Sequence, residues 1–176
     1  MTTQRWKLSS SSPEQTEAIA RELAQNLPAA AVTVGMTGRL GAGKTCFVRG
    51  LAGGMEIEPD EVASPTFVYL VEYGAEPNHL NHADLYRLED TEPEHAWQVF
   101  ESIGLFDALE SETLTAVEWW EHYRGPSPTR LVTVEFVAEK ADDRAIFFEL
   151  NGPDLEATAD WLARQEAAGK DGRASG

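Results

Sequence analysis

The chain has 176 residues with 14 basic and 30 acidic side chains, so its formal net charge is −16. This length fits one domain, and the 42% hydrophobic and 25% charged content is that of a globular protein and not of a disordered one. No apolar run approaches the roughly 20 residues of a membrane span, and the first twelve residues do not resemble a secretion signal. Cys46 is the only cysteine, so we expect a cytoplasmic protein without an internal disulfide.

The negative charge is concentrated in the middle of the sequence. Residues 56–121, which we call the acidic segment, hold 17 acids and one base, Arg87, whereas the remainder balances 13 acids against 13 bases. A chain this acidic is a poor candidate for holding RNA or DNA by itself, because Lys and Arg contacts to phosphate dominate nucleic-acid affinity. The acidic segment fits either a solvated face or a surface for a partner or a metal ion.

The first predicted element is a helix over Glu14–Leu27, which a serine N-cap and Pro13 introduce and in which apolar residues recur at helical spacing. A short β-branched run at Ala30–Met36 then predicts a strand that is buried on both faces. It leads into a glycine-rich sequence, Gly38–Thr45, and Cys46–Met55 predicts the helix that follows.

The remaining elements predict a mixed sheet with helices. We expect strand character in Val62–Tyr73 past Pro65, then a short buried strand that runs into a turn over Leu80–Leu88. A helix over Glu94–Phe100 and a strand over Leu114–Trp119 are expected next, followed by an antiparallel hairpin of Arg130–Ala138 and Arg144–Leu150 and a helix over Pro153–Gln165. This order predicts an α/β fold whose sheet has a parallel core and antiparallel edges. Residues 1–166 are expected to form one domain and residues 167–176 a disordered tail.

The sequence GRLGAGKT at Gly38–Thr45 satisfies the phosphate-binding pattern G-x-x-x-x-G-K-[ST]. Its glycines allow backbone N–H groups to approach phosphate oxygens, Lys44 can reach the β- and γ-phosphates, and the Thr45 hydroxyl can bind Mg²⁺. Because the pattern follows a buried strand and opens a helix, it lies where it must lie to bind a nucleotide. We therefore predict a three-layer fold of the P-loop NTPase type.

A phosphate-bound Mg²⁺ also needs carboxylates. Asp84 and Glu118 each close a predicted strand, and open α/β sheets bind ligands at the carboxyl ends of their strands. We predict both as metal ligands beside Thr45, and either could orient the attacking water. Thr66 is a candidate switch-like hydroxyl, and its alternative is an ordinary strand threonine. None of the four histidines has zinc spacing with a cysteine, although His82 is of interest because of its neighbours.

Four motifs in order resemble the TsaE (YjeE) ATPases of bacterial tRNA threonylcarbamoyladenosine biosynthesis. They are the loop Gly38–Thr45, the SPTF sequence Ser64–Phe67, the HADLYR sequence His82–Arg87 and the pair Glu118-Trp119. The resemblance spans roughly residues 8–150. It implies weak ATP hydrolysis that supports TsaD-like and TsaB-like partners in modifying tRNAs that read codons beginning with A. Contact with tRNA is then expected only through those partners, and no membrane is involved.

The resemblance also implies roles for individual residues. Nucleotide contacts are expected from the loop and the start of its helix, namely Gly38, Gly41, Ala42, Gly43, Lys44, Thr45 and Cys46. Lys44, Asp84 and Glu118 are the expected catalytic residues, with Asp84 in the Walker B-like place. Thr45, Glu118 and Asp84 are the expected Mg²⁺ ligands. Trp119 neighbours the metal site, and Thr16 and Arg144 match positions near the nucleotide base.

Two other classes of P-loop protein share this loop. A small-molecule kinase normally carries an arginine-rich lid that clamps phosphates, but Arg87 is the only arginine of the acidic segment. Phosphorylation of metabolites by ATP would favour that alternative. A GTPase-like switch would carry an N-K-x-D guanine motif, which the sequence lacks. Competition of GTP against ATP for binding distinguishes this third class.

Overall fold

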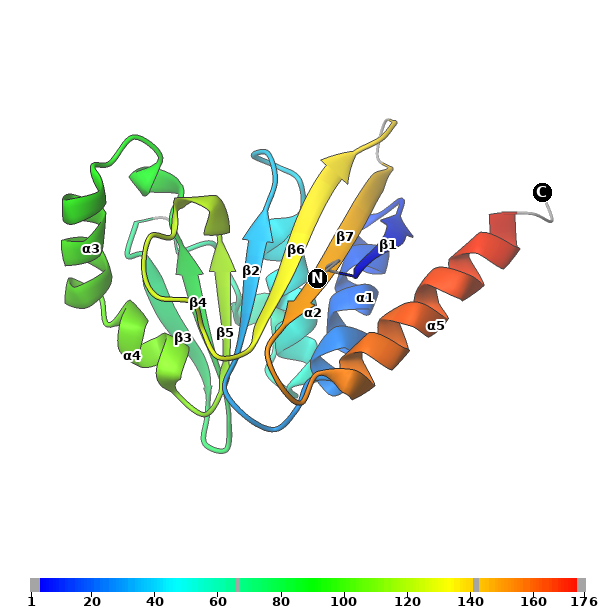
Figure 1. The fold of residues 1–176 in the computed structure, drawn as a ribbon, viewed down its shortest axis with the longest axis horizontal. Helices are drawn as coiled ribbons and strands as arrows, with labels where there is room; N and C mark the ends of the chain where they lie inside the picture. The colour runs from blue at the N-terminus through cyan, green and yellow to red at the C-terminus, as the bar shows by residue number, and fades with distance from the viewer. Residues whose placement is uncertain (1–3, 66, 141–142, 174–176) are drawn as a thin grey trace.

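In the computed structural model, which describes residues 4–65, 67–140 and 143–173, seven strands form one sheet in the order β1-β7-β6-β2-β5-β4-β3 (Figure 1). The strands are β1 (Arg5–Ser10), β2 (Val32–Thr37), β3 (Leu70–Ala75), β4 (Asn78–Asp84), β5 (Leu114–Glu118), β6 (Leu131–Ala138) and β7 (Arg144–Asn151). The four central strands, β4, β5, β2 and β6, run parallel, while β3, β7 and β1 are antiparallel to their neighbours. The predicted α/β class, with a parallel core and a C-terminal antiparallel hairpin, is confirmed.

Helices lie on both faces of the sheet, which gives three layers. They are α1 (Pro13–Gln25), α2 (Lys44–Gly54), α3 (Pro93–Ser102), α4 (Leu105–Glu110) and α5 (Glu156–Arg173). Helices α1 and α2 pack on one face and form the larger core with β2, β5, β6 and β7. Helices α3 and α4 pack over β4 and β5 on the other face and form a smaller aromatic core (Figure 1).

Strand periodicity decides which side chains face α2. Along β5, Leu114 and Ala116 belong to the core under α1 and α2, whereas Val117 belongs to the core under α3 and α4. Because successive side chains of a strand alternate between faces, Glu118 shares the face of Ala116. The same alternation puts His82 and Asp84 of β4 on the α2 side, since Leu80 lies there.

Two elements were absent from the sequence prediction. Strand β1 lies at one edge of the sheet. It buries Trp6 and Leu8 and leaves Arg5 exposed and Lys7 half-buried, and this alternation is only six residues long. Helix α4 also has six residues, too few to show a helical period.

Several boundaries also differ from the prediction, and the largest differences are at β3 and α5. Strand β3 starts at Leu70, because the chain turns at Val68 and Tyr69, where both backbone N–H groups donate to the Pro65 carbonyl. Helix α5 continues through Arg173, although the sequence was expected to become a tail at residue 167. The helix is held at Glu166, whose carboxylate accepts the Lys7 backbone N–H at 2.8 Å. This contact lowers the pKa of Glu166, as does the Lys170 ammonium at 3.0 Å.

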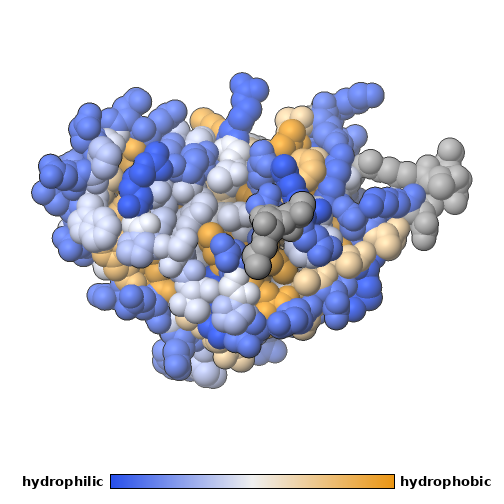
Figure 2. All heavy atoms as spheres, viewed as in Figure 1, coloured by the Kyte–Doolittle hydropathy of each residue, from blue (hydrophilic) through white to orange (hydrophobic). Residues whose placement is uncertain are grey.

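The surface is predominantly polar. Hydrophilic residues cover most of the face shown in Figure 2, and apolar residues show there only in small patches. Of the 17 acids in the acidic segment, Asp84 and Glu118 are buried and the other 15 are exposed. No helix in the described part of the chain is long and apolar enough to cross a membrane.

Candidate functional site

The predicted loop and both predicted carboxylates meet at one edge of the sheet. Strands β2, β5 and β4 are parallel neighbours in which Met36 pairs with Glu118 and Glu118 pairs with Asp84. The loop leaves β2 directly after Thr37, so all three features lie at the carboxyl ends of adjacent strands. They surround a cleft of about 440 Å³, which is lined by Leu40, Gly41, Ala42, Gly43, Lys44, Thr45, Cys46, Ser64, Asp84, Tyr86, Glu118 and Trp119.

The loop has the backbone that its glycines were expected to allow. Gly38, Gly41 and Gly43 have φ angles of 137°, 75° and 110°, in the region that residues with a Cβ rarely adopt. Gly43 is also the N-cap of α2 and has no side chain to cap the helix. The first backbone N–H groups of α2 therefore remain available to an anion, and the helix dipole favours negative charge there.

Lys44 lies inside the loop and not in solvent. Its Nζ donates to the carbonyls of Gly38 at 2.6 Å and Arg39 at 3.0 Å, and it lies 3.8 Å from the centre of the Trp119 ring. Burial lowers the pKa of Lys44, while the negative charges of Glu118, Glu121 and Asp84 oppose that shift. The ammonium is thus oriented by neutral carbonyls, which a phosphate group can replace as the stronger, charged acceptor.

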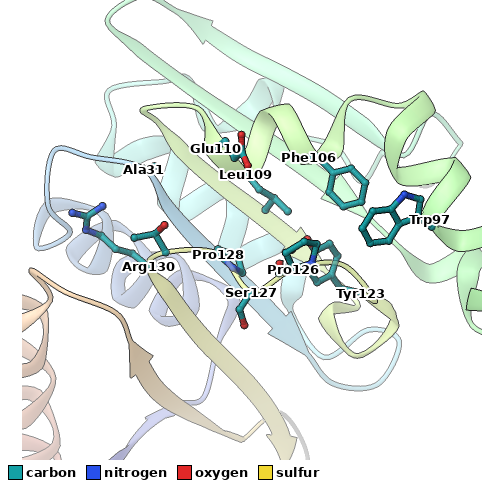
Figure 3. A pocket seen from close by; sticks show the side chains of 11 residues that line it. Ala31, Trp97, Phe106, Leu109, Glu110, Tyr123, Pro126, Ser127, Pro128 and Arg130 are labelled. Atoms are coloured by element: carbon teal, nitrogen blue, oxygen red, sulfur yellow. The ribbon is translucent and has the colours of Figure 1, made fainter.

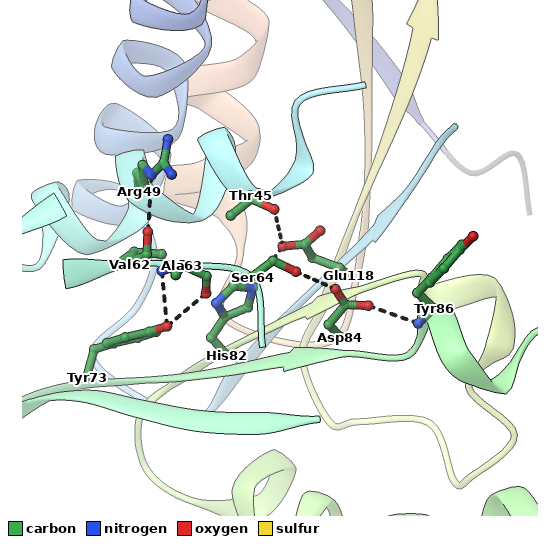
Figure 4. Close-up of polar contacts among 10 residues, drawn as sticks. All are labelled: Thr45, Arg49, Val62, Ala63, Ser64, Tyr73, His82, Asp84, Tyr86 and Glu118. Carbon is green, nitrogen blue, oxygen red and sulfur yellow. Dashed lines mark hydrogen bonds and ion pairs between the residues drawn. The ribbon is translucent and has the colours of Figure 1, made fainter. Parts of the chain in front are cut away.

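Glu118 connects the phosphate loop to the sheet. Its Oε1 accepts the Thr45 hydroxyl at 2.8 Å and lies 2.9 Å from His82 Nε2 (Figure 4). Glu118 is 3% exposed and His82 fully buried, so both contacts are made away from bulk water. The proximity of Thr45 and Glu118 is what a shared metal ion requires.

Asp84 is held by different partners on the neighbouring strand. Its Oδ2 accepts the Ser64 hydroxyl at 2.6 Å, and its Oδ1 accepts the backbone N–H of Tyr86 at 2.9 Å (Figure 4). Ser64 was not among the predicted site residues, although it belongs to the SPTF motif and precedes a proline that restricts its backbone. Thr66, the predicted switch-like residue, lies outside the described residues.

Three more of the predicted site residues lie close to the loop, namely Arg144, Thr16 and Cys46. Arg144 Nη1 donates to the Ala42 carbonyl at 3.3 Å, and a Cβ on Gly43 would come within 2.7 Å of that nitrogen. Thr16 differs from the expectation of a nucleotide contact, because its side chain is fully buried and its hydroxyl bonds to Ser10 and to the Ser12 carbonyl.

The Cys46 thiol lines the cleft and donates to the Pro13 carbonyl at 3.2 Å. Burial and the neighbouring Glu17 carboxylate raise its pKa to about 11, so the thiol is a poor nucleophile near neutral pH.

Trp119 forms the wall of the cleft opposite the loop. Its backbone is left-handed, with φ 59° and ψ 45°, which is uncommon for a residue with a large side chain. The ring contacts Tyr86 and stacks on His122, with ring centres 5.0 Å and 5.7 Å away. Trp120 lies on the opposite face of the sheet, where its ring covers Gly35 and stacks on Tyr123.

The side chains at this edge suit a hard cation that is also bound by phosphate. Within the described ranges, no group of three His, Cys, Asp or Glu residues could hold a metal ion alone. Mg²⁺ at phosphate sites typically uses oxygen ligands, with one or two carboxylates plus the phosphates and waters. The Thr45 hydroxyl with Glu118 and Asp84 fits that donor set.

Two further cavities are of interest, one that adjoins the cleft and one that shares no lining residue with it. One, of about 350 Å³, shares Leu40, Gly41 and Ala42 with the cleft and extends toward Phe136 and Arg144. The other, of about 360 Å³, lies between α3, α4 and the segment before β6, and its lining is mainly apolar and aromatic (Figure 3). Among its described lining residues only Glu110 and Arg130 are charged, and Arg130 is paired with Asp154, so this cavity has no counterpart of the loop and carboxylates that line the cleft.

Comparison with known proteins agrees with this geometry. The family model described as threonylcarbamoyl adenosine biosynthesis protein TsaE matches residues 10–146. The chain is similar to the tRNA threonylcarbamoyladenosine biosynthesis protein TsaE of Bacillus subtilis, with 32% identity over 154 residues that cover 88% of this chain and 91% of the relative. It is 40% identical over 111 residues to the protein of that name from Aquifex aeolicus, covering 62% of this chain and 73% of the relative.

A solved structure gives the same result. The crystal structure of Bacillus subtilis YdiB superposes with a TM-score of 0.71 at 25% sequence identity, covering 93% of this chain and 97% of that one. The predicted P-loop NTPase-like fold is thereby confirmed. The matching family model, the relatives and the shared fold together establish that the chain belongs to the TsaE family.

Proposed function

We propose that this chain is an ATP-binding and ATP-hydrolysing subunit required for threonylcarbamoyladenosine modification of tRNAs that read codons beginning with A. It acts with TsaD-like and TsaB-like partners, and its hydrolysis is weak without them. The observation that carries this proposal is the cleft in which the loop Gly38–Thr45 faces Glu118 and Asp84 at the carboxyl edge of the sheet. Family membership supports the pathway, and the cleft supports the chemistry.

The phosphates are bound by the loop and by the start of α2. Backbone N–H groups at the uncapped N-terminus of α2 donate hydrogen bonds to phosphate oxygens. The Lys44 ammonium gives up its hydrogen bonds to the Gly38 and Arg39 carbonyls and donates to β- and γ-phosphate oxygens instead. Trp119 keeps the ammonium directed into the cleft through its ring face. The nucleoside extends over the adjoining cavity toward Arg144, and Thr16 supports the Gly43 turn from below.

Thr45 and Glu118 would hold Mg²⁺, with Asp84 beside them. When bound, the ion would supply positive charge that stabilises the negative charge of the phosphate groups. Glu118 is the direct carboxylate ligand, because it already contacts the Thr45 hydroxyl at 2.8 Å. Asp84 is the second carboxylate, and its hydrogen bonds from Ser64 and the Tyr86 backbone keep it in one orientation.

Hydrolysis requires a water aligned with the γ-phosphorus. The water oxygen forms the new bond to phosphorus and the bond from phosphorus to the β–γ bridging oxygen breaks, which gives ADP and inorganic phosphate, while the proton lost by the water passes to a phosphate oxygen or to solvent. We assign the orientation of this water to Asp84, since its carboxylate accepts hydrogen bonds and is fixed on the rigid end of β4.

The tRNA is held by the partners and not by this chain. The 15 exposed acids of the acidic segment face solvent and would repel a phosphate backbone. A net charge of −16 therefore favours a protein partner with a basic surface as the direct contact.

The proposal is tested by reconstitution. Threonylcarbamoyladenosine formation on tRNA is measured with the purified chain, TsaD-like and TsaB-like proteins, ATP and Mg²⁺, together with ATP turnover of the chain alone and in the mixture. We expect Lys44→Ala to abolish modification and turnover, while Lys170→Ala, an exposed lysine of α5, retains both. Full modification by the Lys44→Ala protein would refute the proposal, and ATP-dependent phosphorylation of a metabolite would replace it with a kinase function.

A further inference from the structure

His82 contacts the cleft residue Glu118 and has no role in the proposed function. Its ring is fully buried on β4, the strand next to the edge strand β3, on the face that α2 covers. Nε2 lies 2.9 Å from Glu118 Oε1, the oxygen that also accepts the Thr45 hydroxyl. One carboxylate oxygen of Glu118 is therefore held by two side chains from two different elements, β4 and α2.

The surroundings of the ring define its tautomer. An ionised Glu118 only accepts hydrogen bonds, so the contact requires a proton on Nε2. Nδ1 is buried and has no hydrogen-bond partner among the described residues. A proton on Nδ1 would leave a buried donor unpaired, which costs more than an unused acceptor. Of the two tautomers, the one with its proton on Nε2 satisfies this environment.

The ring is also fixed from the side. Tyr73 of β3 packs against it, with ring centres 6.1 Å apart. The Tyr73 hydroxyl donates to the Ala63 carbonyl at 2.9 Å and accepts the Ala63 backbone N–H at 3.3 Å (Figure 4). Ala63 precedes Ser64, whose hydroxyl donates to Asp84. The pair Ala63-Ser64 therefore contacts both Tyr73, which packs against His82, and Asp84.

We propose that His82 is a positioning residue for Glu118. Its Nε2–H fixes the carboxylate so that Oε1 faces Thr45 and Oε2 remains available to a divalent cation. This inference rests on the proposed function, because it takes Glu118 as a ligand of Mg²⁺. Hydrogen-bonded partners of metal ligands commonly determine affinity, and their loss typically weakens it about 10-fold to 100-fold.

Three substitutions separate hydrogen bonding from packing. The amide nitrogen of His82→Gln can reach the place of Nε2, whereas that of His82→Asn reaches only the place of Nδ1, and His82→Leu offers no donor. We expect Asn and Leu to weaken Mg²⁺ affinity about 10-fold to 100-fold and Gln to restore most of it. Thr33→Val is the matched control, because it alters another buried side chain whose hydroxyl has no partner in the described structure.

The measurement uses the full chain and a fluorescent ATP analogue. Mg²⁺ is titrated at fixed nucleotide, and nucleotide affinity is measured separately in EDTA, where every variant should equal the wild-type protein. Nitrogen NMR of the protein without nucleotide should show Nε2 protonated and Nδ1 unprotonated. This spectroscopic result does not depend on any bound metal.

The outcomes are distinguishable. Equal Mg²⁺ affinity in wild-type, Asn and Gln proteins, or a Gln protein no better than Asn, would overturn the role of His82. A wild-type protein whose nucleotide binding ignores Mg²⁺ would overturn the proposed function itself. If His82→Leu does not fold, the comparison of Gln with Asn still decides, because both retain a polar side chain of similar size.

Discussion

The two buried carboxylates of the cleft differ in their hydrogen-bond partners. Glu118 is bonded to the Thr45 hydroxyl and the His82 ring, whereas Asp84 is bonded to the Ser64 hydroxyl and a backbone N–H. A carboxylate that contacts Thr45, the proposed metal-binding hydroxyl of the loop, is suited to hold a cation. One that is oriented by the sheet and its following turn is suited to align a water. We therefore propose Glu118 mainly as a metal ligand and Asp84 mainly as the residue that aligns the water.

This division predicts two kinetic patterns. Glu118→Gln should weaken Mg²⁺-dependent ATP affinity about tenfold or more, because it removes the charge of a direct ligand. Asp84→Asn should reduce turnover by about 100-fold or more while changing ATP affinity much less, because it removes the group that orients the water. Binding and single-turnover assays on each variant measure the two effects, with the exposed Asp107→Asn of α4 as control. The reverse pattern would exchange the two assignments.

The sequence predicted the site residues that belong to a motif of fixed spacing or that end a strand of the sheet. The loop and the acids at strand ends follow from spacing and from the rule that α/β sheets bind ligands at carboxyl ends. Ser64 and the His82 contact were not predictable, because they depend on the register between β4 and β5 and on the path of the chain before β3. A hydroxyl in a loop carries no local signal of the carboxylate that it will meet.

At the scale of elements, the continuity of the apolar pattern determined what the sequence could predict. Strands β2 and β5 are short but almost continuously buried, and α1 has a clear cap in the Ser12 side chain that accepts the Gln15 N–H. Strand β1 alternates buried residues with exposed or half-buried ones, and helix α4 has only six residues, so neither pattern stands out from a loop. Both are ordered by neighbours that lie far away in the sequence, as the pairing of β1 with β7 shows.

Strand β2 carries a glycine that its neighbours require. A Cβ on Gly35 would come within 2.5 Å of the Trp120 ring, which covers this strand on the face away from α2. Gly35→Ala should therefore lower the free energy of unfolding by about 1–3 kcal/mol.

Urea denaturation measures this cost. Gly169→Ala is the matched control, since nothing lies within 4 Å of its Cβ position and alanine favours the helix, so its stability should be unchanged or up to about 1 kcal/mol higher. Equal stability of Gly35→Ala and the wild-type protein would show that Trp120 moves aside freely.

At the scale of the whole molecule, burial sorts the acidic segment into two classes. Its two buried acids line the cleft, and its 15 exposed acids lie after α2, along the β3–β4 pair, on α3 and α4 and next to them, and after β5. Glu89, Asp90, Glu92 and Glu94 lie between the carboxyl end of β4 and the start of α3, at the same edge of the sheet as the cleft. Glu121, a further exposed acid at this edge, is close enough for its charge to act on Lys44.

Reversing these four charges to lysine should weaken association with the TsaD-like and TsaB-like proteins about tenfold or more, because complementary charge becomes like charge. Glu56, Glu58, Glu76 and Glu112 provide the matched control: they are exposed acids of the same segment, adjacent to the amino ends of β4 and β5 or the end of α2. Affinities by light scattering or calorimetry compare the two variants. If both bind like the wild-type protein, the acidity serves solubility alone.

Three consecutive residues, Glu118, Trp119 and Trp120, place their side chains in three different environments. The carboxylate faces α2, the first ring covers Lys44, and the second ring covers Gly35 on the far face of the sheet. The left-handed backbone at Trp119 sets the direction in which the chain leaves the cleft and so places Trp120. A substitution of Trp120 in the aromatic core beyond the sheet is thus also a change one residue away from the cleft that Trp119 lines, so this segment serves both the packing of the core and the shape of the cleft.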